Sequence, residues 1–219
     1  MTPGEWERCA DPDTMLHALS GQADDRRCRL FTCACCRRVW PLLADERSRA
    51  AVETAERYAD GLADRDELAT AEAGAQAVAF AEASARARAG VKVSHVTQAT
   101  LAATGERADA TIWAAWATAE AARAPAEERR HQCALLRCIF GNPFCPPAPL
   151  TLVVRAYNSS AVRRLAESIY EGRRFEDLPV LADLLEEAGC TDAALLGHLR
   201  GPGPHALGCH ALDVVLGRT

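Results

Sequence analysis

Hydrophobic positions recur every three to four residues along most of this chain, the spacing that brings them onto one face of an α-helix. Residues 25–40 show it most clearly, because their arginines fall mostly outside one apolar stripe formed by Cys28, Phe31, Cys35 and Val39. Alanine-rich segments of high helix propensity follow over residues 45–60 and 64–90. Similar patterns continue to the end of the chain, so we predict an all-α fold of roughly nine to eleven helices.

Residues that favour helix ends divide this pattern into separate elements. Thr2 to Glu5 has the spacing of a capping box, and Asp11 followed by Pro12 predicts the start of a second short helix. A single helix is expected over about residues 97–122, and the stretch PHALGCHALDVVLG, residues 204–217, is expected to form another.

One segment, GNPFCPPAPL at residues 141–150, is conspicuously irregular and contains four prolines. We expect residues 1–219 to form a single all-α domain, and this segment is the predicted boundary if that domain has two lobes. The residues that follow, LTLVVRAY, fit a short strand or an extended segment, after which Asn158, Ser159 and Ser160 offer caps for the next helix.

The composition narrows the class of protein. The net charge of −5 argues against nonspecific binding to nucleic acid, because that binding depends on neutralising phosphates. No apolar run approaches the ~20 residues that a membrane-spanning helix needs, and the chain opens on a polar, acidic stretch rather than a secretory signal. We therefore expect a cytoplasmic protein without a membrane anchor. Its ten cysteines are then expected to be free thiols, since disulfides are rare in that compartment.

Three cysteines crowd into the segment CACC at residues 33–36. Zinc sites usually use hooks of the type C-x₂₋₄-C, whereas C-x-C-C on a helix does not easily bring two thiolates to one point. We interpret these cysteines mainly as small core residues, with Cys35 or Cys36 as a candidate to lend one thiolate to a metal and Cys33 pointing away from the apolar stripe. Because the nearby arginines would lower the pKa of an exposed thiol, a reactive cysteine is an alternative.

The best candidate ligands for a metal lie near the C-terminus. His205 and Cys209 are four residues apart, so on a helix an imidazole and a thiolate would share one face. His198 or Cys190, on preceding helices, would supply the remaining ligands of a tetrahedral zinc ion. A buried histidine beside core cysteines is the alternative interpretation. A second set could also gather around one metal, and it consists of His131, Cys133, Cys138 and Cys145.

Five segments, RLFTCACCRRVW, AERYADG, LLRCIFGNPF, FEDLPVLADLLEEAGC and HLRGPGPHALGCHALDVVLG, cover much of the chain. Together they resemble a large paralogous family of uncharacterised planctomycete proteins. The resemblance implies an intracellular protein and no particular activity. The family usually has Trp in place of His210 and Arg in place of Cys145, so the resemblance does not make these two residues part of a shared site.

The chain lacks common enzyme signatures, including a Walker A sequence, a dinucleotide-binding glycine motif, HExxH and G-x-S-x-G. We therefore expect a non-enzymatic helical module whose partner is another protein. The alternative is a metal-binding protein, with zinc as the metal, or a thiol-redox protein that uses the C-terminal histidines and cysteines. A small hydrolase or transferase with an unrecognised site is a third interpretation.

Overall fold

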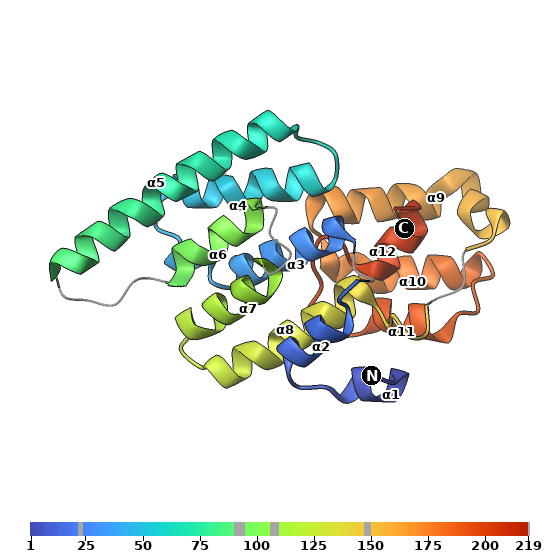
Figure 1. The fold of residues 1–219 in the computed structure, drawn as a ribbon. Helices are drawn as coiled ribbons and strands as arrows, with labels where there is room; N and C mark the ends of the chain where they lie inside the picture. Colours follow the sequence, from blue (N-terminus) through green and yellow to red (C-terminus); the bar gives the residue numbers. More distant parts are fainter. Residues whose placement is uncertain (22–23, 90–94, 106–109, 147–149, 219) are drawn as a thin grey trace. The chain divides into compact units, whose positions relative to one another are not determined.

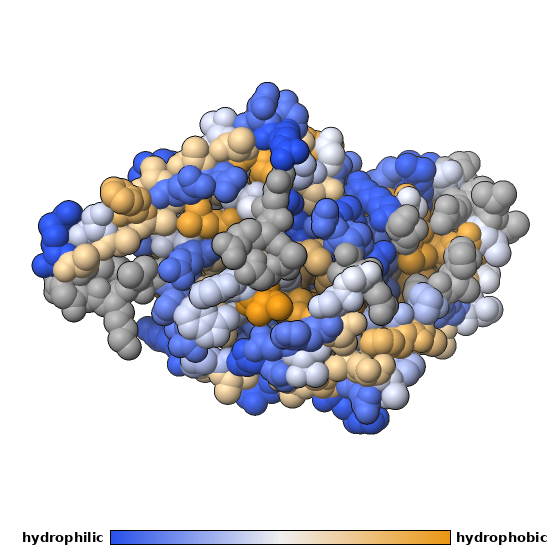
Figure 2. All heavy atoms as spheres, viewed as in Figure 1, coloured by the Kyte–Doolittle hydropathy of each residue, from blue (hydrophilic) through white to orange (hydrophobic). Residues whose placement is uncertain are grey.

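The computed structural model describes residues 1–21, 24–89, 95–105, 110–146 and 150–218 (Figure 1). Over these residues the protein has twelve α-helices, two short 3₁₀-helices and no strand, which confirms the all-α prediction. None of the helices in these ranges is long and apolar enough to cross a membrane. On the face shown in Figure 2, hydrophilic and hydrophobic residues are interspersed.

The chain divides into two compact units. Residues 9–133 form the first, here called the N-terminal unit; residues 134–219 together with residues 1–8 form the second, here called the C-terminal unit. The division falls within one helix, α8 (Pro125–Phe140). The proline-rich segment 141–150 belongs to the C-terminal unit, and the lobe boundary expected there stays a prediction.

The N-terminal unit is built around α3 (Asp25–Arg38). This helix packs against α4 (Glu46–Ala59), α6 (His95–Thr104) and α7 (Ala110–Ala121). The other helices of the unit are α2 (Pro12–Ala18), the 3₁₀-helix η1 (Trp40–Leu42) and α5 (Arg65–Ala89). All residues from Leu30 to Cys36 are buried, so this part of α3 is enclosed on every side. Cys33 lies outside the apolar stripe, as expected, but it is a core residue all the same.

Two buried carboxylates in the N-terminal unit pair with arginines of α3. Glu128 is 5% exposed, and its two carboxylate oxygens share the single Nε–H of Arg38, at 2.8 and 2.9 Å. Glu56 is 4% exposed and accepts a hydrogen bond from Arg37 Nη2 at 2.6 Å. Burying a carboxylate is costly unless a partner compensates its charge. Arg37 and Arg38, although partly exposed themselves, therefore compensate the charge of two carboxylates buried in this unit.

Replacing Arg38 by methionine is expected to lower the free energy of unfolding by about 2 kcal/mol, since it leaves the Glu128 carboxylate buried without this partner. The matched control is Arg163→Met, because Arg163 pairs with Glu167 where both side chains are more than one-third exposed. That change should cost less than about 1 kcal/mol. Urea unfolding followed by far-ultraviolet circular dichroism measures both, and equal costs would contradict the assignment.

The C-terminal unit contains α9 (Leu152–Gly172), the 3₁₀-helix η2 (Phe175–Asp177), α10 (Leu178–Glu187), α11 (Ala193–Arg200) and α12 (His210–Leu216). Helix α10 packs against α9 and α11, and α12 packs against α9. Their shared core is almost entirely aliphatic and includes Val162, Ile169, Leu181, Leu185, Leu199 and Leu212. This core supports the ends of α11 and α12, where the candidate ligands lie.

The first eight residues belong to the C-terminal unit and form α1 (Pro3–Arg8). The predicted capping box is present, because the Glu5 amide donates to Thr2 Oγ1 and the Thr2 amide donates to a Glu5 carboxylate oxygen. Trp6 is fully buried, and its indole N–H donates to the Gly141 carbonyl at 2.7 Å. Arg137 donates in turn to the Trp6 carbonyl. Helix α1 is thus held on the end of α8.

Three predictions about the secondary structure differ from the observed elements. The segment after residue 150, expected as a short strand or an extended segment, is the start of α9, which Thr151 caps by accepting the Val154 amide. Ser160, expected to cap a later helix, lies inside α9 with a φ of 64°. The single helix expected over residues 97–122 is two helices, because α6 ends at Thr104 and α7 begins at Ala110; residues 106–109 lie outside the described residues.

Candidate metal centre

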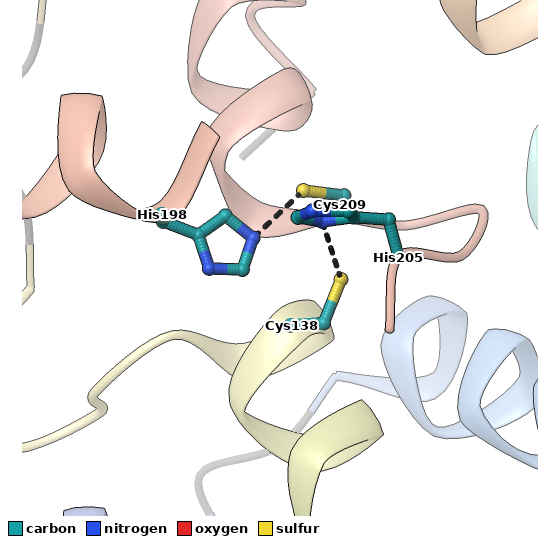
Figure 3. A group of neighbouring side chains, drawn as sticks. All are labelled: Cys138, His198, His205 and Cys209. Carbon is teal, nitrogen blue, oxygen red and sulfur yellow. Dashed lines mark hydrogen bonds between the residues drawn. The ribbon is translucent and has the colours of Figure 1, made fainter. Parts of the chain in front are cut away.

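Two cysteines and two histidines of the C-terminal unit point toward one another in Figure 3. Cys138 lies in the last turn of α8, His198 near the end of α11, His205 in the connection after α11, and Cys209 immediately before α12. One ligand atom from each residue lies within 4.8 Å of all the others. Both cysteines are buried and both histidines are half-buried. Among the described residues, this is the only group of three or more such side chains with this geometry.

The distances in this cluster approach those of a tetrahedral zinc ion. His198 Nε2 lies 3.2 Å from Cys209 Sγ, and Cys138 Sγ lies 3.9 Å from His205 Nδ1. Zinc–sulfur bonds of about 2.3 Å and zinc–nitrogen bonds of about 2.0 Å, at tetrahedral angles, separate ligand atoms by roughly 3.3–3.8 Å. Small side-chain movements would therefore bring all four atoms onto one ion.

His205 and Cys209 lie in the non-helical connection between α11 and α12. The sequence-based expectation that these residues share one helical face is wrong, since α12 begins only at His210. Pro202 and Pro204 have no amide hydrogen for a helical bond, and Gly203 and Gly208 adopt positive φ angles of 84° and 81°. A turn, rather than one face of a helix, places the imidazole and the thiol side by side.

The His205 ring is oriented by a carbonyl group. Its Nε2 lies 3.2 Å from the Gly201 oxygen, which can only accept a hydrogen bond, so Nε2 carries the hydrogen. In the neutral ring Nδ1 is then unprotonated, and this atom faces Cys138. Metal-binding histidines commonly donate their second ring nitrogen to a carbonyl or carboxylate in this way. The backbone therefore prepares His205 to coordinate through Nδ1.

His210 supports two of the other candidate ligands. Its Nδ1 donates to the Cys138 carbonyl at 2.9 Å. Its ring packs on the His198 ring, with centroids 4.4 Å apart. A Cβ at Gly141 would approach the His210 ring to 3.0 Å, so the glycine allows this close packing. His210 is thus a positioning residue, although its own nitrogens are outside the cluster of candidate ligands.

The two thiols differ in protonation. A hydrogen bond from Cys138 lowers the pKa of Cys209 well below its usual value; burial opposes this effect, while His198 and His205 reinforce it. The same hydrogen bond, together with burial, raises the pKa of Cys138. Burial disfavours the charged form of His205, but the hydrogen bond with Cys209 and its charge outweigh this effect and raise the pKa of His205. Of the two thiols, Cys209 is therefore the stronger acid.

These shifts predict that metal binding weakens in acid. Protons compete with a metal for imidazole and thiolate ligands. Because the pKa of Cys138 is raised well above its usual value, zinc displaces a proton from this thiol throughout the neutral range, and the raised pKa of His205 adds a second competing proton as the pH falls. The apparent dissociation constant for zinc should rise about tenfold per pH unit for each proton that zinc displaces. Competition with a chelator of known affinity at several pH values measures this dependence. An affinity that does not change with pH would contradict the ligand assignment.

The other sequence-based candidates are not in this cluster. Cys190 follows α10 and is buried in the aliphatic core. Cys35 and Cys36 are buried in the N-terminal unit, where burial raises the pKa of both thiols, so the arginines of α3 do not activate them. From the second candidate set, Cys133 is buried and Cys145 is exposed, and neither belongs to the cluster. Sequence reasoning thus placed Cys138 in the wrong set.

Of two cavities in the protein, one is lined by candidate metal ligands and the other is not. A small one, of about 180 Å³, is lined by Cys138, His198 and His205 together with Pro202 and Pro204. A larger one in the N-terminal unit, of about 650 Å³, is lined by Cys28, Arg29 and Tyr58 among others and contains none of the four candidate ligands. Burial raises the pKa of Cys28 despite its hydrogen bond with Thr111, so the larger cavity holds no activated thiol.

Comparison of the chain with protein-family models, with curated proteins and with solved structures gave no match. The function is therefore inferred from the geometry and chemistry of Cys138, His198, His205 and Cys209.

Proposed function

We propose that the C-terminal unit binds one zinc ion through Cys138, His198, His205 and Cys209, and that this ion has a structural role. The observation that carries the proposal is the convergence of four nitrogen and sulfur ligand atoms within 4.8 Å. Two thiolates and two imidazoles form a ligand set typical of structural zinc, and two thiolates balance the charge of the ion. The ordered surroundings of His205 and His198 support the same assignment.

Four protein ligands favour a structural role over a catalytic one. Catalytic zinc sites keep one coordination position for water or substrate, whereas four side chains fill a tetrahedral ion. The four residues come from α8, α11, the connection after α11 and the start of α12. A bound ion would join these segments near the edge of the aliphatic core. A non-enzymatic role agrees with this arrangement, and binding to another protein stays a prediction.

Elemental analysis of protein purified without a histidine tag tests the proposal directly. We expect about one zinc per chain, in line with four ligands for one tetrahedral ion. Replacing zinc by cobalt(II) should give the intense visible bands of tetrahedral cobalt and a sulfur-to-cobalt charge-transfer band. Protein that retains no zinc and binds no cobalt when it is added would refute the proposal.

A further inference from the structure

We propose that Cys138 and Cys209 form a peroxide-sensitive pair, and that their oxidation to a disulfide releases the zinc ion. This inference rests on the proposed zinc site and adds a regulation to it. The reactant is a small hydroperoxide, with hydrogen peroxide as the simplest example. The product is a C-terminal unit in which a covalent bond replaces the metal between α8 and the start of α12.

The first support is the distance between the two sulfurs. They lie within 4.8 Å of each other. A disulfide requires a sulfur–sulfur bond of about 2.05 Å, so the two atoms need to approach further as the metal leaves. The two cysteines come from segments far apart in the sequence, and the fold holds them together before any oxidation. The bond would therefore form within the existing unit.

The second support is a route for a small oxidant. The cavity of about 180 Å³ is lined by Cys138, His198 and His205. Hydrogen peroxide is only slightly larger than a water molecule, whose share of the liquid is about 30 Å³, so it fits this space. Cys209 does not line the cavity. Peroxide therefore meets Cys138 first, and Cys209 is the resolving thiolate.

The reaction balances without another reactant. The Cys138 sulfur attacks one oxygen of hydrogen peroxide; the sulfur–oxygen bond forms, the oxygen–oxygen bond breaks, and the departing hydroxide takes a proton to become water. The Cys209 thiolate then attacks the sulfenic sulfur, which forms the disulfide and expels a second hydroxide that also becomes water. The sulfur pair loses two electrons and peroxide gains them. Zinc loses both thiolate ligands and dissociates from the two remaining histidines.

Peroxide should react with Cys138 and Cys209 in preference to the cysteines of the N-terminal core. Cys33, Cys35 and Cys36 are buried in the N-terminal unit, where burial raises the pKa of their thiols. A buried thiol without a metal reacts slowly, because the thiolate is the nucleophile. Zinc would instead hold Cys138 as a thiolate, since a metal binds the deprotonated ligand. Cys145 is exposed and Cys9 and Cys28 are half-buried, so these three cysteines are the ones that can compete for peroxide, Cys145 first among them. A variant without the Cys145 thiol distinguishes oxidation of Cys145 from oxidation of the Cys138–Cys209 pair.

The test treats zinc-loaded protein with hydrogen peroxide and follows zinc release with a chromogenic chelator, with peptide mass mapping at the end. We expect one disulfide between Cys138 and Cys209 for each zinc released, and recovery of zinc binding after a dithiol reductant and zinc are added. Cys145→Ser should release zinc at the same rate as the original chain. Cys138→His keeps four nitrogen and sulfur ligands but removes the pair, so no intramolecular disulfide should form at the site.

The outcomes separate the two proposals. Untreated protein without zinc contradicts the zinc site itself. Zinc-loaded protein that keeps its metal in peroxide, or that releases it without a Cys138–Cys209 disulfide, overturns the redox inference and leaves the zinc site standing. Because the disulfide is mapped in the unmodified chain, this result does not depend on whether the Cys138→His variant folds.

Discussion

Replacing Cys209 by serine is expected to lower the affinity for zinc by more than about a hundredfold. Loss of a residue that only orients a ligand costs up to about a hundredfold in metal affinity, and loss of a thiolate ligand should cost more. Cys209 is fully buried and its sulfur lies 3.2 Å from His198 Nε2, so serine would leave an oxygen that is a poorer ligand at the same place. Competition with a chelator of known affinity measures the change.

The matched control for this variant is Cys190→Ser. Cys190 is 6% exposed and belongs to the same aliphatic core, but it lies outside the cluster of four ligands. This change should reduce stability modestly and leave zinc stoichiometry near one per chain. The pair of variants thus separates loss of a ligand from the general effect of placing a hydroxyl in the core. If Cys209→Ser retains stoichiometric zinc with unchanged affinity, Cys209 is not a ligand.

Removing zinc with a chelator is expected to destabilise the C-terminal unit by about 4 kcal/mol, relative to protein in free zinc at a thousand times the dissociation constant. The physical reason is that the site exists only in the folded unit, so metal binding adds to its folding free energy. Amide hydrogen exchange should accelerate in α11, in the connection that follows and in α12. The N-terminal unit is the internal control, because all four ligands lie outside it.

Two results would contradict this prediction. Equal acceleration in α3 and α12 would indicate a general effect of the chelator, and unchanged exchange near His198 and Cys209 would show that no stabilising metal had been bound. Hydrogen exchange is suitable here because it reports each unit separately, whereas a single unfolding temperature combines both.

Local signals in the sequence predicted much of the fold. Asp11 caps α2 by accepting the Thr14 amide, as its position before Pro12 predicted. The errors arose where local patterns are ambiguous. Residues 152–157 are rich in β-branched and aromatic residues, and tertiary packing on the aliphatic core overrides that preference in α9.

The candidate site was predictable only where its residues are close in sequence. His198, His205 and Cys209 were all named as ligands, although the turn that brings two of them together was mistaken for a helix. Cys138 was not joined to them, because helical periodicity shows which face of α8 is buried but not which segment packs against it. Cys190 was included for its sequence proximity, yet the turn after α10 directs it into the core.

The docking of Trp6 has a consequence for the order in which the protein folds during synthesis. Residues 9–133 leave the ribosome as a continuous stretch and can fold as a unit. The acceptor of the Trp6 indole, the Gly141 carbonyl, emerges only afterwards. Until then the Trp6 indole lacks the acceptor that it has in the folded protein. Closing the long loop between Trp6 and Gly141 is an entropic cost that this contact has to offset.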